Sequence, residues 1–332
     1  MKQLKKVLKR VYYGISPRYR HVRRMRRVYE DVLCAAAKAP DAESAKRRAF
    51  LEMPTIDEKT ALLQEGNLLL LKRLKRICEE EGISFWILGG TLLGAVRHGG
   101  FIPWDDDVDV GMLRQETEKL RLALKKWPGL QLEAYCNNRP HNGVPIFSQV
   151  LKLTLDDSQS PFWVDILVYD FAGDNTSAPE ELWKEITRIR EGTQARLISA
   201  GAEFSRTYWD EKVTPEDRAV IDRIYRDSME RLPAVKEEAY IYRSIDSFCG
   251  AWQRLFPCER MMPFCELSFA GELFPAPKDY EWYLRLQYGD YLTLPNDIGQ
   301  MHIAFLNQKI QHAEHALEKL KSMNGSESIE GR

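Results

Sequence analysis

The stretch ILGGTLLGAVRHGGFIPWDDDVDVGM, residues 87–112, ends in a run where aspartates alternate with valines. On a β-strand, residues two apart point to the same side, so Val108 and Val110 are expected in the core and Asp107 and Asp109 on the opposite face. Two parallel carboxylates repel each other unless a cation lies between them. Because oxygen ligands favour Mg²⁺ or Mn²⁺, this pair predicts a divalent metal site.

The glycine pair near the start of the stretch predicts a phosphate site. Gly89 and Gly90 are expected to end the apolar strand ISFWILGG, residues 83–90, and to open a short helix at Thr91. Backbone N–H groups at a helix start have no partner within the helix and attract phosphate. A metal-binding carboxylate pair that faces such a cradle is suited to chemistry on a nucleotide pyrophosphate.

A third acid would complete the metal site, and Asp165 in FWVDILVYD is the best candidate. It stands within a strand of large apolar residues, where a charge is costly to bury unless it faces a metal ion or a partner. Asp170 competes with it, but Asp170 stands at the end of the strand and is suited to starting a turn.

Two other interpretations of the acidic run are less favoured. A solvated acidic loop does not explain the strict alternation with valine or the flanking Phe101 and Trp104. A calcium loop starting at Asp105 would place Glu116 at its twelfth position, but its sixth position needs glycine and here is Val110.

Around this stretch, the pattern predicts an α/β first half with a mixed sheet and a mainly helical second half. A helix is expected over 55–81, capped by Thr55 or Asp57 and ended by Gly82. Further helices are expected over 91–98, 114–127, 179–200, 215–231, 234–247, 278–288 and 301–322. Strands are expected over 107–112, 146–155 and 162–171, with a short β piece near 264–274.

The charge distribution is asymmetric although the net charge of the 332 residues is −1. Residues 1–29 hold eleven Lys or Arg and no acid. Residues 2–11 predict a basic amphipathic helix, for which two interpretations stay open: contact with an anionic membrane, and a solvated or partner-bound tail. Nucleic acid is not expected as a partner, because the aromatic and glycine pattern of a known RNA module is missing.

The remaining composition predicts a cytoplasmic protein, with the membrane interpretation adding peripheral contact at the inner face. No apolar run approaches the roughly 18 residues of a spanning helix, and no apolar signal region follows the basic start. The six cysteines are widely spaced, as in a reduced compartment. Cys249, Cys258 and Cys265 match no common zinc spacing, so buried thiols are favoured over a zinc site.

Three segments resemble the LicD family, which includes the fukutin-related proteins. GGTLLGAVRHGGFIPWDDDVDVGM, residues 89–112, is similar to the long family signature. LKLTLDDSQSPFWVDIL, residues 151–167, resembles the second block, and PAPKDYEWYLRLQYGDYLTLP, residues 275–295, resembles the closing block. The resemblance spans roughly residues 60–320. The chain departs from the family pattern at Lys152, where Arg is commoner, and at VYDF, where Pro-Leu-Asp is usual.

The resemblance implies a nucleotidyltransferase-type fold and a phosphotransferase. Such enzymes move a phospho-alcohol, such as phosphocholine or an alditol phosphate, from a CDP-activated donor such as CDP-choline to a glycan hydroxyl and release CMP. The expected acceptors are teichoic acid, lipopolysaccharide or capsule, including lipid-linked forms. Two rivals are nucleotidyl transfer with release of pyrophosphate, and a catalytically silent nucleotide-binding scaffold in surface-polymer assembly.

The resemblance also implies residue roles. Asp107, Asp109 and Asp165 would be catalytic and would bind Mg²⁺ or Mn²⁺. The expected substrate-binding residues are Gly90, Thr91, Arg97, His98, Asp105, Asp106 and Lys152. Arg97 would hold a phosphate oxygen, with a surface salt bridge as its alternative, and His98 has a turn position as its alternative. Asp105 and Asp106 would orient the nucleotide or a second metal ion.

Four regions are expected on this basis. Residues 1–54 would be a basic helical segment that associates with membranes. Residues 55–175 would form the nucleotidyltransferase-like catalytic core. Residues 176–322 would be mainly helical and complete the substrate pocket, and residues 323–332 would be a linker or tag remnant.

Overall fold

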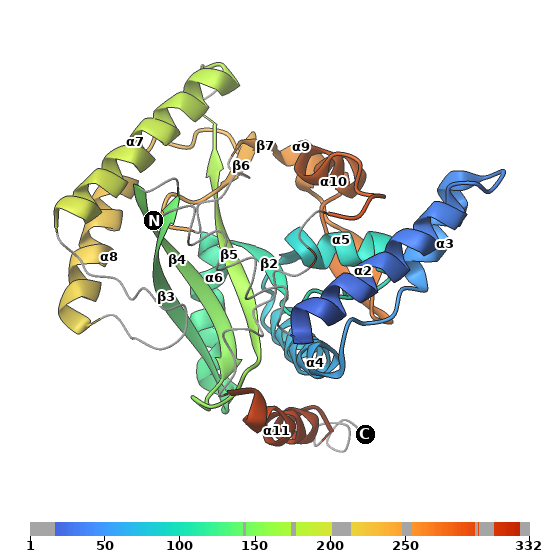
Figure 1. Ribbon diagram of the computed structural model, residues 1–332. Coiled ribbons are helices and arrows are strands. Elements are labelled where there is room, and N and C mark those ends of the chain that lie inside the picture. Colours follow the sequence, from blue (N-terminus) through green and yellow to red (C-terminus); the bar gives the residue numbers. More distant parts are fainter. Residues whose placement is uncertain are drawn as a thin grey trace, which may run out of the picture.

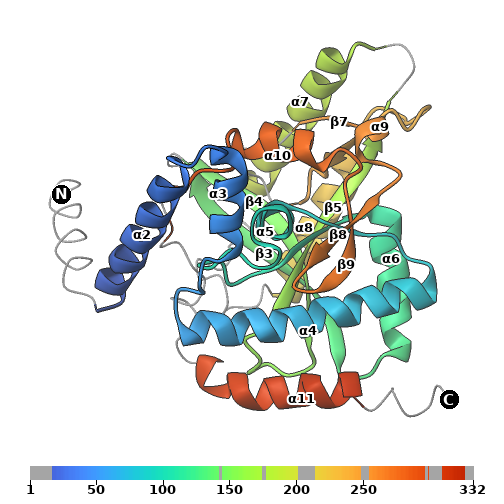
Figure 2. The same cartoon turned by 90° about the vertical axis from the view of Figure 1, so that its right-hand side faces the viewer.

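The computed structural model describes residues 17–141, 144–173, 177–200, 214–247, 254–295, 298 and 309–325. The fold is mixed α/β, with helices on both sides of a twisted seven-stranded sheet (Figures 1 and 2). Its strands are β1 (Trp86–Ile87), β2 (Asp109–Leu113), β3 (Leu130–His141), β4 (Val144–Leu155), β5 (Trp163–Ala172), β6 (Tyr240–Arg243) and β7 (Phe256–Pro257). The sheet order is β1-β2-β5-β4-β3, and β6 pairs with β5 and β7.

The direction of the strands makes the sheet mixed. Among the described strands, β2 and β5 run parallel, and the other neighbours pair antiparallel. A separate hairpin is formed by β8 (Cys265–Phe269) and β9 (Glu272–Ala276). The central strand β5 therefore lies between β2, from the acidic stretch, and β4, from the second resemblance block.

The helices cover the sheet and its edges. The described ones are α2 (Pro17–Ala36), α3 (Ala42–Leu51), α4 (Glu58–Glu81), α5 (Gly89–His98), α6 (Arg114–Ala123), α7 (Pro179–Ser199), α8 (Pro215–Met229), α9 (Cys258–Met261), α10 (Tyr280–Tyr288) and α11 (Ala313–Gly325), with short 3₁₀ turns η1 (Leu124–Lys126) and η3 (Lys309–His312). Helices α4 and α6 pack on β5, and α11 lies alongside α4 (Figure 2). Within the described part of the chain, no helix has the length and apolar character of a membrane crossing.

The long helix α4 forms where the sequence predicts it. Of the two expected caps, Asp57 is the one used: its carboxylate accepts the Thr60 N–H at 2.8 Å. Gly82 ends the helix in a left-handed conformation, with φ of 64°. Gly66 lets α4 approach β5 closely, because a Cβ at this position would overlap the ring of Phe162.

Most predicted elements are confirmed, and two are not. The expected strand over 83–90 is only two residues long, because α5 already begins at Gly89. The helix expected over 234–247 is wrong: Tyr240–Arg243 is strand β6. Its aromatic and β-branched residues bury Ile241 and Tyr242 against β5, a gain that outweighs the helical spacing. Strand β3 was not predicted from the sequence. The predicted helical segments 2–11 and 301–308 lie outside the described residues.

Candidate active site

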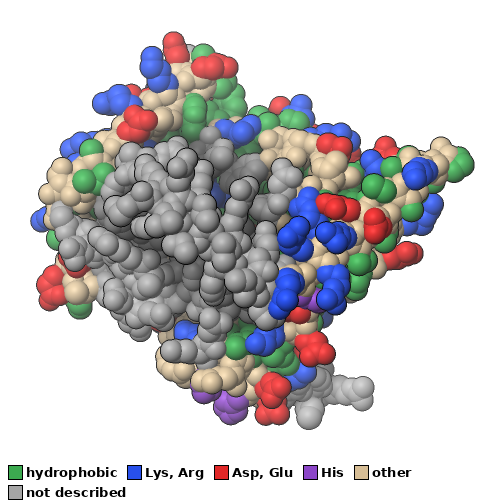
Figure 3. Space-filling model, viewed as in Figure 1, with side chains coloured by type: hydrophobic (Ala, Val, Ile, Leu, Met, Phe, Trp, Pro, Cys, Tyr) green, Lys and Arg blue, Asp and Glu red, His purple; other side chains and the backbone are tan. Residues whose placement is uncertain are grey.

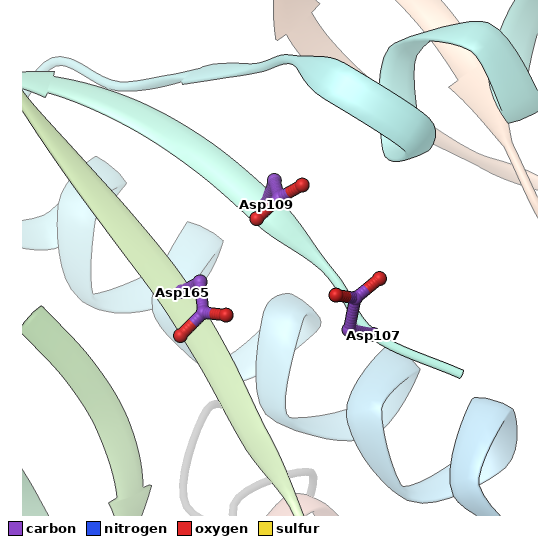
Figure 4. A group of neighbouring side chains, drawn as sticks. All are labelled: Asp107, Asp109 and Asp165. Carbon is purple, nitrogen blue, oxygen red and sulfur yellow. The ribbon is translucent and has the colours of Figure 1, made fainter. Parts of the chain in front are cut away.

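Three carboxylates meet where β2 enters the sheet. Asp109 on β2 lies directly opposite Asp165 on β5, and Asp107 comes just before β2. Oxygen atoms of Asp107, Asp109 and Asp165 all lie within 4.8 Å of one another (Figure 4). Within the described residues, this is the only cluster of three or more side chains suited to holding a metal ion.

The alternation in the sequence explains why these acids share one face. Val108 and Val110 have no exposed surface and lie in the main core cluster. Val164 and Ile166, which flank Asp165, are likewise completely buried. Since successive side chains on a strand point to opposite faces, burying the valines directs the carboxylates to the other face of the sheet.

Backbone and side-chain hydrogen bonds fix the acidic segment. The Asp165 N–H donates to Val108 O at 2.8 Å, which sets the register of the two strands. The Asp109 N–H donates to the Thr91 hydroxyl at 2.9 Å, and Thr91 is buried. The hydroxyl of Thr91 therefore positions Asp109, while the predicted contact of Thr91 with phosphate stays a prediction.

Two polar residues of α4, which sequence reasoning missed, donate hydrogen bonds to the backbone of the acidic segment. The Gln64 amide donates to Asp105 O at 2.7 Å and to Ile102 O at 3.1 Å. The Asn67 amide donates to Asp106 O at 2.9 Å, and its oxygen accepts the Trp163 N–H at 2.9 Å. Buried polar groups on a helix are the signal that could have identified them, because they need partners. Asn67 thus links the acidic segment to β5.

The start of α5 lies against the same carboxylates. Gly89 has φ of 57°, and a Cβ there would lie 2.8 Å from Asp109 Oδ2. A Cβ at Gly90 would overlap Asp105 Oδ2. The lack of a side chain at the two glycines thus leaves room for the acids beside the helix start, while the predicted contact of Gly90 with phosphate stays a prediction.

The local electrostatics favour a cation. Burial, followed by the negative charges of Asp107, Asp106 and Asp109, raises the pKa of Asp105 well above its usual value. Asp106 has no exposed surface. The pKa of Tyr288, at the end of α10, is raised by burial and then by Asp109 and Asp105, so its hydroxyl belongs to the same environment. The sequence analysis missed Tyr288 as a site residue.

Lys152 faces the third acid. It stands on β4 directly opposite Asp165, and its ammonium group donates to Asp165 Oδ1. Only 1 % of Lys152 is exposed, and its Nζ lies 4.9 Å from the ring centroid of Trp163. The Trp163 indole N–H donates to the other oxygen of Asp165 at 3.3 Å. Lys152 therefore belongs to the site through Asp165, and its predicted phosphate contact stays a prediction.

Arg97 and His98 are built into the fold. Arg97 is 4 % exposed and donates to Tyr291 O at 2.8 Å and Thr293 O at 3.2 Å, so it is not the surface salt bridge considered as its alternative. The Arg97 Nε–H donates to His98 Nε2 at 3.0 Å, and His98 Nδ1 donates to Phe50 O at 2.8 Å. Burial lowers the pKa of Arg97 to about 10. Their predicted substrate contacts are not tested by these bonds.

Asp170, the competitor of Asp165, has a different partner. Arg114, at the start of α6, donates to both oxygens of Asp170 at 2.9 Å and to those of Asp246 at 2.8 and 3.1 Å. Arg114 also donates to the Ser244 hydroxyl. The two carboxylates raise the pKa of Arg114 against the effect of its burial. This two-carboxylate clamp ties β5 to the segment after β6, away from the three-acid cluster.

Comparisons with known proteins identify this region. Residues 82–191 match the family model described as LicD/FKTN/FKRP, nucleotidyltransferase domain. The chain is 27 % identical to the lipopolysaccharide cholinephosphotransferase LicD of Haemophilus influenzae over 264 residues, which is 73 % of this chain and 96 % of that protein. It is 48 % identical over 50 residues to the human ribitol 5-phosphate transferase FKRP, covering 14 % of this chain and 10 % of that protein.

A third relative matches a longer piece of the chain than FKRP does, at lower identity than FKRP. The ribitol-5-phosphate transferase FKTN of Mus musculus is 32 % identical over 89 residues, which is 26 % of this chain and 19 % of that protein. The matched family region contains α5, β2, β4 and β5, and hence all three clustered aspartates. Residues 82–191 therefore carry a domain of the LicD family.

Proposed function

We propose that the protein is a metal-dependent phosphotransferase that moves a phospho-alcohol from a CDP-activated donor to a hydroxyl of a cell-surface glycan and releases CMP. The convergence of Asp107, Asp109 and Asp165 is the observation that carries the proposal. The relatives named as cholinephosphotransferase and ribitol 5-phosphate transferases support a phospho-alcohol as the transferred group. Teichoic acid, lipopolysaccharide and capsule remain the proposed acceptors, including lipid-linked forms.

The donor set fits Mg²⁺ or Mn²⁺. Three carboxylates within 4.8 Å offer hard oxygen ligands. The raised pKa of the neighbouring Asp105 reflects, besides burial, the negative potential that these acids create, which a cation would relieve. A bound ion would offset negative charge on the pyrophosphate oxygens and on the leaving CMP. We also propose that β1, β2, β5, β4 and β3, with α4, α5 and α6, form a nucleotidyltransferase-like core.

Each residue of the site would have a separate role in the transfer. Asp109 or Asp165 would accept the proton of the attacking glycan hydroxyl. The hydroxyl oxygen would then bond to the phosphorus distal to cytidine, and the bond from that phosphorus to the bridging oxygen would break. The first N–H groups of α5 lie beside the acids at Gly89 and Gly90, where they would hold the donor phosphate without interference from side chains.

Product analysis tests this function. The protein would be incubated with CDP-choline, CDP-ribitol, CDP-glycerol or CDP-ethanolamine, Mg²⁺ and a glycan acceptor, after a melting-temperature screen for the donor that stabilises it most. Release of CMP supports the proposal, and release of pyrophosphate would support nucleotidyl transfer instead. Stabilisation by donor and metal without turnover on any acceptor would favour a binding scaffold. Asp107→Ala should remove turnover, and near-normal turnover would refute the site.

The proposed setting is the cytoplasmic side of the membrane, with no nucleic acid as partner. The described cysteines Cys34, Cys78, Cys258 and Cys265 are free thiols, which is consistent with a reduced compartment. The amphipathic segment 2–11, on which the sequence-based membrane interpretation depends, lies outside the described residues.

A further inference from the structure

Helix α2 presents an unusually basic face. Its outward side chains include Arg20, Arg23, Arg24 and Arg27, all exposed. Figure 3 shows Lys and Arg side chains gathered over α2 on the side facing the viewer. At 100° per residue these four arginines fall within about a third of the circumference of the helix. The opposite side of α2 packs on the protein through Val22 and Tyr29, which are 7 % and 0 % exposed.

Asp31 is the one acid of α2 within the arc of these arginines, and no ion pair between it and them is present among the described residues. Within the part of the chain that the structure describes, none of the four arginines forms an ion pair or other recorded polar contact. By contrast Arg26, on the inner side, donates to Glu30 at 2.6 Å and to Pro295 O at 2.8 Å. Arg26 thus contributes to the packing of α2 on the protein, whereas the four outward arginines face away from it, where an external anion can reach them.

The arrangement opposes the stability of the helix itself. Arginines three and four positions apart repel each other on a helix surface. The first turn of α2 has no acid and the last turn has no base, the reverse of what the helix dipole favours. A solvated helix gains nothing from this pattern, whereas an anionic partner would relieve it.

Exposed apolar side chains along one edge of the arginine arc distinguish between anionic partners. Val28 and Val32 are 43 % and 41 % exposed and follow Arg24 at helical spacing. Leu51, at the end of the neighbouring helix α3, is 57 % exposed. A soluble polyanion offers nothing apolar to these side chains, but the headgroup region of a bilayer accepts both basic and apolar groups.

We propose that this face of α2, defined by Arg20, Arg23, Arg24, Arg27, Val28 and Val32, docks on an anionic lipid surface. The docking also has a consequence for the site. Arg26 holds Pro295, and Arg97 of α5 holds Tyr291 and Thr293 of the same loop, so α2 is fixed to the helix whose start meets the acids. If the transferase function is correct, docking holds the site at a set orientation to a lipid-linked acceptor.

Vesicle sedimentation of the full chain tests the proposal without donor or turnover. The vesicles contain equal parts of phosphatidylglycerol and phosphatidylcholine, or phosphatidylcholine alone. The variant R20Q/R23Q/R24Q/R27Q should bind the anionic vesicles on the order of several hundredfold more weakly, at about fivefold for each lost charge. Wild type should bind phosphatidylcholine vesicles poorly.

A matched control changes four other exposed basic residues that have no recorded ion pair, in R223Q/R226Q/R231Q/K236Q on and after α8. The control loses as many positive charges as R20Q/R23Q/R24Q/R27Q, but from another part of the surface. It should therefore keep most of the vesicle affinity of wild type. Equal binding by the two quadruple variants would overturn the proposal. Circular dichroism and melting temperature establish that both variants are folded.

A third variant separates lipid from soluble polyanion. Val28→Ser with Val32→Ser should weaken vesicle binding that persists at high salt, because screening removes only the electrostatic part. Unchanged binding of this variant, together with inorganic polyphosphate competing fully with vesicles, would assign the face to a soluble polyanion and overturn the lipid proposal. Because no outcome involves turnover, failure here is separate from failure of the transferase proposal.

Discussion

Asp109 and Asp165 lie opposite each other on the parallel strands β2 and β5; the Asp109 N–H donates to the Thr91 hydroxyl of α5, and the Asp165 N–H donates to Val108 O. Two unit charges within 4.8 Å repel by on the order of 3 kcal/mol at an effective dielectric constant of about 20. Because the sheet register pairs the two residues, their side chains stay close to each other. Lys152 offsets part of this repulsion at Asp165, and a divalent cation would convert the remainder into attraction.

Removing one acid should stabilise the metal-free protein and abolish its response to metal. Asp109→Asn keeps the shape of the side chain and removes one repelling charge, so we expect a gain of about 1–3 kcal/mol in the free energy of unfolding without metal. The rise in melting temperature that Mn²⁺ causes in wild type should disappear. Turnover should fall on the order of a thousandfold. A variant that remains stabilised by Mn²⁺ like wild type would contradict the metal site.

Asp170→Asn is the matched control, because Asp170 is the other acid of β5. Its carboxylate accepts two hydrogen bonds from Arg114, so its neutralisation should destabilise the protein by roughly 1–3 kcal/mol. Stabilisation by Mn²⁺ should survive. Opposite outcomes for the two variants, in urea unfolding with and without Mn²⁺, distinguish the metal site from the clamp.

Lys152 is expected to tune the same site through Asp165. Its ammonium group contacts Asp165 Oδ1, so Lys152→Met removes a positive charge beside the metal-binding carboxylates. We expect Mn²⁺ to bind on the order of tenfold more tightly, while turnover falls because Asp165 loses one of its two positioning contacts. Isothermal titration with Mn²⁺ measures the first effect. Lys152→Arg keeps the charge and should keep the affinity, and weaker Mn²⁺ binding in Lys152→Met would contradict this role.

The faces of the site were predictable from the sequence, but its connections were not. The alternation of Asp107, Val108, Asp109 and Val110 determines which side chains are buried, because strand periodicity is local. The partner of Lys152 depends on the register of β4 with β5, which no local pattern encodes. The same holds for β6, whose segment has helical spacing and becomes a strand only because β5 offers an edge.

Arg97 illustrates the limit for polar residues. The family resemblance implies a phosphate contact for its guanidinium, and this stays a prediction. No local pattern indicates the contacts that the structure shows, with Tyr291 and Thr293 in a loop almost two hundred residues later. A long flexible side chain has several partners within reach, and tertiary packing decides among them. The glycines were more predictable in one respect, since the helix that they were expected to open does begin at Gly89.

Gly90→Ala should damage the site with little effect elsewhere. The added Cβ would overlap Asp105 Oδ2, so the acidic side chain must turn away and the segment carrying Asp107 must adjust. We expect turnover to fall at least tenfold and Mn²⁺ affinity to decrease. Gly192→Ala on α7 is the control, because nothing lies within 4 Å of its added Cβ; it should keep full activity and gain slightly in stability. Equal activity of both variants would show that Gly90 is not required by the site.

His98 should make the fold sensitive to acid. Burial, followed by the charge of Arg97, lowers the pKa of His98 to about 3, while an unfolded histidine titrates near 6.5. Because the unfolded chain then binds more protons, the contribution of neutral His98 is fully present above about pH 6.5 and is lost as the pH falls towards 3.

His98→Asn offers an amide in place of the Nδ1 donor to Phe50 O and does not titrate. The free energy of unfolding of wild type relative to this variant should therefore drop by about 2 kcal/mol between pH 7 and pH 5, as measured by urea unfolding. Parallel pH profiles of the two proteins would show that His98 is protonated in the folded state, and a loss of turnover at pH 7 in the variant would instead favour the substrate contact predicted for it.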